Sequence, residues 1–303
     1  MRTTGKGRFA PCARPVGKAA VGIVFLLALC MAALAGCGGQ ASSSASSAAG
    51  SQAERSKSSV QLQIFAANSL EQAMPLVQAL YTERHPEVTF ADSQFKASGD
   101  LVQEIQAGAS ADILITASKA TMDDAEAFIV PESRVTMFGN DLELCAAKGS
   151  GMRVTNLTDL KSDQIKRIAV GDPTFVPAGK YANQSLNSAD YGQPLYSSSE
   201  GEGGAYDPSI ADKIAVANQV GTCAQWVASG NCDVGFVYTS DLYRYDGIES
   251  IYTVPEEMHK IITYPGAVLA GSQHQQEAEA FLKFCMTDPD ALAVWQDNGF
   301  ELK

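Results

Sequence analysis

The stretch Gly171-Asp172-Pro173-Thr174-Phe175-Val176-Pro177-Ala178-Gly179-Lys180-Tyr181-Ala182 is the part of the chain from which the fold can best be worked out. It follows a short apolar run, residues 168–170, that is typical of a strand end, and it leads into residues 180–186, which favour a helix. The start of a helix leaves backbone N–H groups unpaired and carries partial positive charge, so such a place suits an anion. An ordinary strand-to-helix connection would look the same, and the rest of the chain has to distinguish the two.

The first 37 of the 303 residues predict a secretory signal peptide. They contain five basic residues (Arg2, Lys6, Arg8, Arg14 and Lys18), an apolar run over residues 19–35, and small residues before a cleavage point. The ending Leu34-Ala35-Gly36-Cys37 resembles a bacterial lipobox, so we expect cleavage before Cys37 and a lipid on that cysteine. A plain transmembrane anchor is the alternative, but the apolar run is shorter than the roughly 20 residues that a spanning helix needs.

Composition after the signal peptide limits the classes of partner. Residues 38–59 are mostly Ser, Ala and Gly, and we expect a flexible tether. Removing the five basic residues of the signal leaves 17 Lys and Arg against 34 Asp and Glu, a net charge of −17. A strongly acidic body disfavours nucleic acid as a partner. Any anion site must therefore act locally, through oriented hydrogen-bond donors.

The cysteines give no metal-binding pattern. Four remain beyond Cys37, namely Cys145, Cys223, Cys232 and Cys285, and none stands in a CxxC or Cys/His spacing. Cys145 lies in an apolar run and is expected to be a buried free thiol. Cys223 and Cys232 could pair only if the helix between them ends early, because a continuous helix keeps them too far apart.

The chain from residue 60 alternates strands and helices. Strands are predicted at residues 60–67, 88–90 and 113–116, with helices at 70–84 and 101–107 between them. This order predicts a parallel sheet flanked by helices, in which ligands bind beyond the carboxyl ends of the strands. Ser69 and Ser98 fall at two such ends, each at the N-cap position of a helix, with a hydroxyl free to donate.

The second half repeats the scheme. Strands are expected at residues 142–147, 167–170 and 233–238, and helices at 275–286 and 289–297 end the chain. Between them, residues 190–207 are rich in Ser, Gly, Tyr and Glu, and we expect a surface loop without a packing signal.

Four motifs together resemble the substrate-binding protein of molybdate ABC importers, in the type II periplasmic-binding-protein family. They are Phe65-Ala66-Ala67-Asn68-Ser69-Leu70, Gly108-Ala109-Ser110-Ala111-Asp112, the 171–182 stretch, and Val234-Gly235-Phe236-Val237-Tyr238. The resemblance implies an α/β fold of two lobes, each a mostly parallel sheet flanked by helices, joined by two crossing strands. It places the first lobe in residues 60–141 and 255–303 and the second in residues 142–254.

The same resemblance implies an oxyanion site in the cleft between the lobes. The first lobe would contribute Ser69 and Ser98, and the second would contribute the backbone N–H groups of Ala178 and Val220 and the hydroxyl of Tyr238. The 190–207 loop is an insertion that changes the spacing from Ala178 to Val220, so Asn218 and Gly221 remain alternatives to Val220. Molybdenum would be bound as an oxyanion, with no cation ligand and no further cofactor. The implied partners are the permease subunits and, through Cys37, the membrane; the implied state is a monomer.

The residue types agree with this function. A tetrahedral dianion without a proton needs only donors, and this set supplies donors; a protonated phosphate would also need an acceptor. The sequence therefore predicts an extracytoplasmic solute-binding protein for molybdate or tungstate. A carrier of sulfate or phosphate is the first alternative. An enzyme on the same fold is the second, but the chain has no GxSxG, HExxH or phosphate-binding glycine loop.

Overall fold

The computed structural model describes residues 59–188 and 193–302, and it contains two five-stranded sheets flanked by helices. The α/β class predicted from the sequence is thereby confirmed. The predicted signal peptide, Cys37 and all but the last residue of the predicted tether lie outside the described residues.

The first sheet has the strand order β4-β2-β5-β12-β6. Its strands are β4 (Gln94–Lys96), β2 (Ile64–Ala67), β5 (Ile113–Ile115), β12 (Thr263–Val268) and β6 (Val135–Gly139). Only β12 runs against its neighbours, because β2 pairs in parallel with β4 and β5, whereas β12 is antiparallel to both β5 and β6. We call this sheet with its helices the first lobe.

One predicted strand has a different place. β3 (Val88–Phe90) does not join this sheet; it pairs in parallel with β1 (Val60–Leu62) in a separate two-stranded sheet. The strand that precedes Ser98 in the main sheet is β4. The prediction that residues 88–90 form the second strand of the main sheet is therefore wrong, although Ser98 still follows a strand end.

The second sheet has the order β11-β7-β10-β8-β9 and, with its helices, forms the second lobe. Its strands are β11 (Ile248–Thr253), β7 (Leu142–Ala147), β10 (Val234–Tyr238), β8 (Ile168–Gly171) and β9 (Ile214–Ala217). Here only β7 is antiparallel to its neighbours. The chain crosses between the two sheets twice. Residues 140–141 lead into β7, and residues 254–262 lead into β12.

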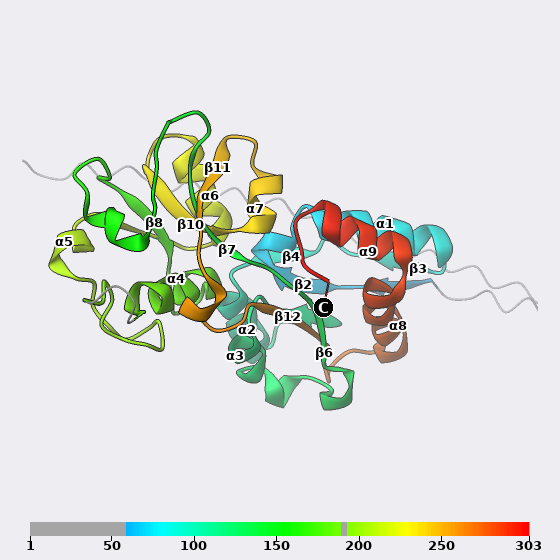
Figure 1. The fold of residues 1–303 in the computed structure, drawn as a ribbon. Helices are drawn as coiled ribbons and strands as arrows, with labels where there is room; N and C mark the ends of the chain where they lie inside the picture. The colour runs from blue at the N-terminus through cyan, green and yellow to red at the C-terminus, as the bar shows by residue number, and fades with distance from the viewer. Residues whose placement is uncertain (1–58, 189–192, 303) are drawn as a thin grey trace, which may run out of the picture. The chain divides into compact units, whose positions relative to one another are not determined.

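Helices cover both faces of the first sheet (Figure 1). On one face α1 (Ala73–Arg84), α8 (Gln275–Thr287) and α9 (Pro289–Asp297) lie side by side; α2 (Ser98–Gln106) and α3 (Lys119–Asp123) pack on the other. The second lobe carries α4 (Pro177–Asn187), α5 (Pro208–Ala211), α6 (Val220–Ala228) and α7 (Thr239–Arg244). Short 3₁₀ turns are η1 (Asn68–Leu70), η2 (Glu126–Phe128), η3 (Pro131–Ser133), η4 (Leu157–Lys161) and η6 (Glu256–Met258).

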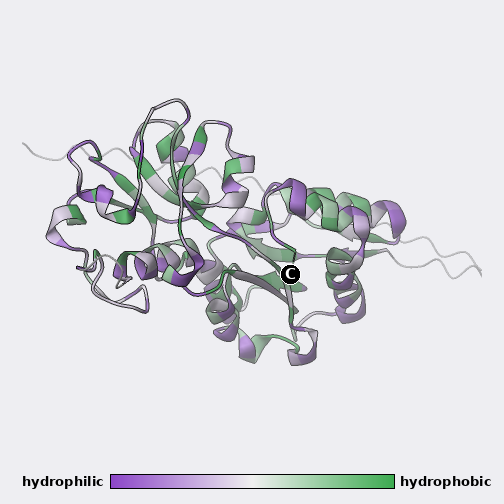
Figure 2. Cartoon of the chain, viewed as in Figure 1, coloured by the Kyte–Doolittle hydropathy of each residue, from purple (hydrophilic) through white to green (hydrophobic). Residues whose placement is uncertain are grey.

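The sequence forms these layers because its apolar residues lie along the strands and on the inner faces of the helices (Figure 2). Successive residues of a strand face opposite sides of the sheet, so Ile64 and Ile113 belong to one core cluster, and Phe65 and Leu114 to another. The central strands β2 and β5 are thus buried on both faces, as expected for a mainly parallel sheet, whereas the edge strands β4 and β6 are partly exposed.

The loop insertion packs more closely than its composition suggests. Leu195 and Tyr196 are 0% and 3% exposed, and Tyr196 forms a β-bridge with Tyr206. The Asn183 amide of α4 donates to the Gly201 carbonyl at 3.0 Å. The prediction of a loop without packing is therefore wrong for residues 195–206. Leu195 and the tyrosines of this segment pack against the hydrophobic core of the second lobe. Residues 189–192 lie outside the described part.

The four cysteines beyond Cys37 are all buried and free, so Cys223 and Cys232 do not form a disulfide in this structure. Burial raises the pKa of Cys223 and Cys285, as expected for inert core thiols. Within residues 59–188 and 193–302, no cluster of His, Cys, Asp and Glu has the arrangement of a metal site, and no helix is long and apolar enough to span a bilayer.

Candidate functional site

A small cavity lies between the two lobes, beyond the carboxyl ends of strands from both sheets. It is lined from the first lobe by Ala67, Asn68, Ser69, Lys96, Ala97, Ser98 and Ala117, and from the second by Val176, Pro177, Ala178, Val220 and Tyr238. All five residues of the predicted site therefore meet in one place. They come from five separate strand ends, after β2, β4, β8, β9 and at the last residue of β10.

Ser98 has a hydroxyl proton that is available for donation toward the cavity. It is 1% exposed, and its hydroxyl oxygen accepts a hydrogen bond from the backbone N–H of Ala117 at 3.0 Å. With an N–H already directed at its oxygen, the hydroxyl proton is the group left to serve a bound species. Ser98 is the first residue of α2, so the positive end of that helix lies beside it.

Ser69 is oriented by a buried relay. Its hydroxyl lies 2.8 Å from the Tyr264 hydroxyl, and the Asn140 side-chain amide donates to Tyr264 at 3.3 Å. The orientation of Asn140 is fixed because its Oδ1 accepts from the backbone N–H of Asp141 at 3.0 Å. Tyr264 thus receives one hydrogen bond and can give its own proton to Ser69, which leaves the Ser69 proton for the cavity. Burial raises the pKa of Tyr264, so this phenol stays protonated.

The second lobe supplies backbone donors from two helix starts. Pro177 and Ala178 begin α4, and Val220 begins α6, and the first N–H groups of a helix have no partner within it. Two neighbouring amides are already used: Gly179 donates to the Val176 carbonyl at 3.0 Å, and Gly221 donates to Asn68 Oδ1 at 3.1 Å. Ala178 and Val220 both line the cavity, and we expect their N–H groups to be the backbone donors available to a bound species. The structure places Val220 there, and of the alternatives Gly221 is engaged with Asn68.

Tyr238 is a buried donor without a partner. Its side chain is 1% exposed, and its hydroxyl makes no hydrogen bond within the described protein. Burial, with smaller contributions from Tyr264, Tyr181 and Asp241, raises its pKa well above the ordinary value, so it remains a phenol. An unpaired buried hydroxyl costs about 1–3 kcal/mol. Such a group at a cavity wall is best explained by a ligand that completes it.

The size of the cavity restricts what it can hold. Its volume is about 10 Å³, measured as space for the centre of a water molecule, which is near the least that holds one water. As the structure stands, so small a space has no room for an amino acid, a sugar or a peptide. Lys96, which sequence reasoning did not single out, brings a positive charge to the wall, and its ammonium pairs with Glu104 at 2.5 Å. Lys180 instead pairs with Glu202 at 2.8 Å, outside this cavity.

Two sequence expectations about the serines are wrong in detail. Neither side chain caps a helix: Ser69 lies within the 3₁₀ turn η1, and α1 begins only at Ala73; Ser98 lies inside α2, with Ala97 at the cap position. The hydroxyls are instead held by Tyr264 and by the Ala117 amide. Tyr264, Asn140 and Ala117 were missed because they lie far from the serines in the sequence.

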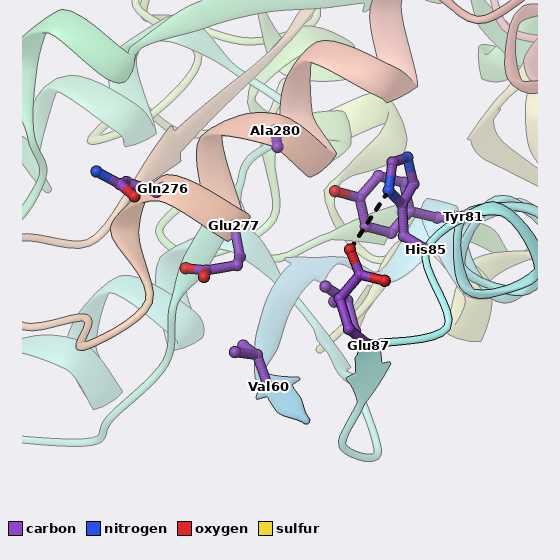
Figure 3. A pocket seen from close by; sticks show the side chains of 8 residues that line it. Val60, Tyr81, His85, Glu87, Gln276, Glu277 and Ala280 are labelled. Atoms are coloured by element: carbon purple, nitrogen blue, oxygen red, sulfur yellow. Dashed lines mark ion pairs between the residues drawn. The ribbon is translucent and has the colours of Figure 1, made fainter. Parts of the chain in front are cut away.

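A larger hollow lies elsewhere, on the first lobe, and its chemistry differs. Figure 3 shows Tyr81, His85, Glu87, Gln276, Glu277 and other side chains around it, and its volume is about 400 Å³. The imidazole of His85 lies 3.9 Å from the Glu87 carboxylate. Two carboxylates on an open wall disfavour an anion, so the small interlobe cavity is the better candidate despite its size.

Comparison with known proteins supports the fold and identifies the family. The model of the family "Bacterial extracellular solute-binding protein" matches residues 62–301. The molybdate-binding protein ModA of Escherichia coli (strain K12) is 32% identical over 249 residues, which cover 79% of this chain and 88% of that protein. A Bacillus subtilis (strain 168) protein, YvgL, named as an ABC transporter substrate-binding lipoprotein, is 28% identical over 81% of this chain and 88% of its own length.

Among solved structures, the substrate-binding domain of a molybdenum ABC transporter from Clostridium difficile is 32% identical. The match covers 81% of this chain and all of the Clostridium difficile domain, with a TM-score of 0.60. The resemblance inferred from the four motifs is confirmed by these matches. The chain belongs to the family of bacterial extracellular solute-binding proteins.

Proposed function

We propose that this protein captures molybdate or tungstate between its two lobes and delivers the ion to an ABC importer. The observation that carries the proposal is the unpaired Tyr238 hydroxyl at the wall of the interlobe cavity, which the hydroxyl residues Ser69 and Ser98 and the helix starts at Ala178 and Val220 also line. A fully deprotonated tetrahedral oxyanion accepts from every side and offers no proton. The names of the relatives from Escherichia coli and Clostridium difficile point to the same ligand.

The donors also favour selection and release. The hydroxyl and amide donors are neutral, and the one ammonium group at the wall, that of Lys96, is paired with Glu104, which suits a ligand that must later leave. A protonated oxyanion such as hydrogen phosphate would place its O–H against donors, and a buried donor facing another donor is costly. Sulfate, which has no proton at neutral pH, has to be distinguished by size.

Calorimetry of residues 38–303 with molybdate, tungstate, sulfate and phosphate tests the proposal. We expect binding of molybdate and tungstate with one ion per protein, and at least tenfold weaker binding of sulfate and phosphate. A folded protein that gives heat only with sulfate or phosphate would make it a carrier of that ion. No heat with any of the four would remove the oxyanion function.

Two single substitutions should weaken binding and yet change stability in opposite directions. Tyr238→Phe and Ser98→Ala each remove one buried donor to a charged ligand, so each should lower the affinity by about 1–3 kcal/mol. Without ligand, Tyr238→Phe removes an unpaired hydroxyl and should leave the melting temperature unchanged or raised. Ser98→Ala leaves the Ala117 amide without its acceptor and should lower the melting temperature. Calorimetry and thermal melts check both, and unchanged affinity in both variants would place these residues outside the site.

The remaining parts of the proposal concern the partners. The permease subunits of an importer would receive the ion, and a lipid on Cys37 would keep the protein at the membrane while the 38–59 segment gives it reach. The name of the Bacillus subtilis relative supports the lipid anchor. We further propose that the protein acts as a monomer, as a binding component rather than an enzyme, without a cofactor.

A further inference from the structure

One side chain of the second lobe reaches across to the first lobe beside the cavity. Arg244, the last residue of α7, donates through Nη1 to the backbone carbonyl of Asn68 at 3.0 Å and to Asn68 Oδ1 at 3.1 Å. Its other terminal nitrogen, Nη2, forms an ion pair with the Glu71 carboxylate. Both partners follow β2 of the first lobe, so these contacts exist only while the lobes are together.

The same contacts fix the orientation of the Asn68 amide. Asn68 lines the cavity, and its Oδ1 accepts from Arg244 and also from the backbone N–H of Gly221 at 3.1 Å. An amide oxygen that faced the cavity would repel an oxyanion. The Gly221 N–H and the Arg244 Nη1, both of the second lobe, bind this oxygen, so it does not act as an acceptor toward the cavity. Arg244 therefore joins the lobes and also removes an acceptor from the cavity wall.

Contacts with residues of its own lobe also hold the side chain of Arg244 in place. Its side chain is 10% exposed, and its guanidinium lies 4.9 Å from the centre of the Tyr245 ring. The buried carboxylate of Asp241 lies 3.6 Å from Nη1. A planar guanidinium with fixed neighbours presents two nitrogens to two acceptors in a rigid fork, a geometry that an ammonium group on a flexible stem does not provide.

We propose that Arg244 is a positioning residue that latches the closed form and sets how long the bound oxyanion stays, which rests on the function proposed above. Because the latch forms after the ion has entered, its loss acts on dissociation more than on association. On the first lobe, Asn68 and Glu71 are the residues that accept the hydrogen bonds and the ion pair of this latch.

Stopped-flow kinetics with the oxyanion that binds most tightly in calorimetry tests this role. Arg244→Lys keeps a positive charge near Asp241 but loses the rigid fork of two nitrogens that holds Asn68 and Glu71 together, so we expect the dissociation rate to rise by about 10- to 100-fold and the association rate to change less than threefold. Glu71→Gln, at a carboxylate that is 51% exposed and easy to replace, should raise the dissociation rate in the same direction by a smaller factor.

Arg84→Lys is the matched control. Arg84 also pairs with two carboxylates, those of Asp288 and Asp290, and lies 5.5 Å from the centre of the Phe284 ring, but all these residues belong to the first lobe. Its substitution should leave both rates unchanged. Wild-type binding with unaltered dissociation in Arg244→Lys and Glu71→Gln overturns the latch, whereas a wild-type protein that binds none of the four ions overturns the proposed function itself.

Discussion

Gly99→Ala should abolish tight oxyanion binding while the protein stays folded. Gly99 lies in the first turn of α2, and its N–H donates across the cleft to the Phe175 carbonyl at 2.9 Å. A Cβ at this position would lie 2.7 Å from the Phe175 Cα and 3.0 Å from its oxygen. Both are backbone atoms that cannot turn aside, so the lobes must stay apart. Overpacking and the lost hydrogen bond together should reduce the affinity by about 100-fold or more.

The stability of the ligand-free Gly99→Ala variant should not fall with its affinity. Alanine inside a helix is favoured over glycine by about 0.5–1 kcal/mol, so the ligand-free melting temperature should stay constant or rise. Gly271→Ala is the control, because an added Cβ there meets no atom within 4 Å. Calorimetry and thermal melts on both variants give the answer. If Gly99→Ala bound within threefold of the wild type, closure at this contact would not be needed for binding.

Replacing Asp241 should change how stability depends on pH. Asp241 is 0% exposed, and burial raises the pKa of its carboxyl from 3.8 to about 6, against the opposing effect of Arg244. In this window the folded state binds a proton that the unfolded state has lost, so the unfolding free energy falls as pH rises from about 4 to 6. The full effect is about 3 kcal/mol, from 1.36 kcal/mol for each unit of pKa.

Asp241→Asn removes this titration. Whatever constant offset the substitution brings, its unfolding free energy relative to the wild type should increase by about 2 kcal/mol between pH 4.5 and pH 7.5, as measured by urea unfolding. Asp159→Asn is a control, because hydrogen bonds from the Thr155 backbone lower the pKa of Asp159 below 3.8. Its titration therefore lies below this pH range, and the unfolding free energy of this variant relative to the wild type should stay nearly constant between pH 4.5 and pH 7.5. An identical pH profile for the wild type and Asp241→Asn would show that Asp241 titrates normally.

Local patterns in the sequence were sufficient for the strand ends. Apolar runs placed residues 142–147 in a strand and residues 289–297 in a helix, as the structure has them. Because carboxyl ends of parallel strands share one edge, Ser69 and Ser98 could be assigned to one region without knowledge of their contacts. Ala178, Val220 and Tyr238 of the other sheet were assigned through the family resemblance. That these five bind the ion is still a prediction; the structure shows that they line one cavity.

The contacts that orient these donors could not be predicted locally. Tyr264 meets Ser69 across 195 residues of sequence, and this contact depends on the register of β12 beside β5. Arg244 meets Asn68 across 176 residues, and it depends on how the lobes close. The cap predictions were wrong for a different reason: the turn η1 delays the start of α1 to Ala73, which leaves Ser69 before the helix and free to meet Tyr264.

The placement of the two antiparallel strands has a consequence for assembly of the chain. β12 lies between β5 and β6, so until residues 263–268 have been made, β6 has no partner in its sheet and β5 has an open edge. The first lobe therefore cannot be completed as the chain emerges from its amino end. It must wait for the second lobe to be synthesised, with β5 and β6 exposed to wrong pairing in the meantime. The two passages that form the cleft thus also make the folding of each lobe depend on the whole chain.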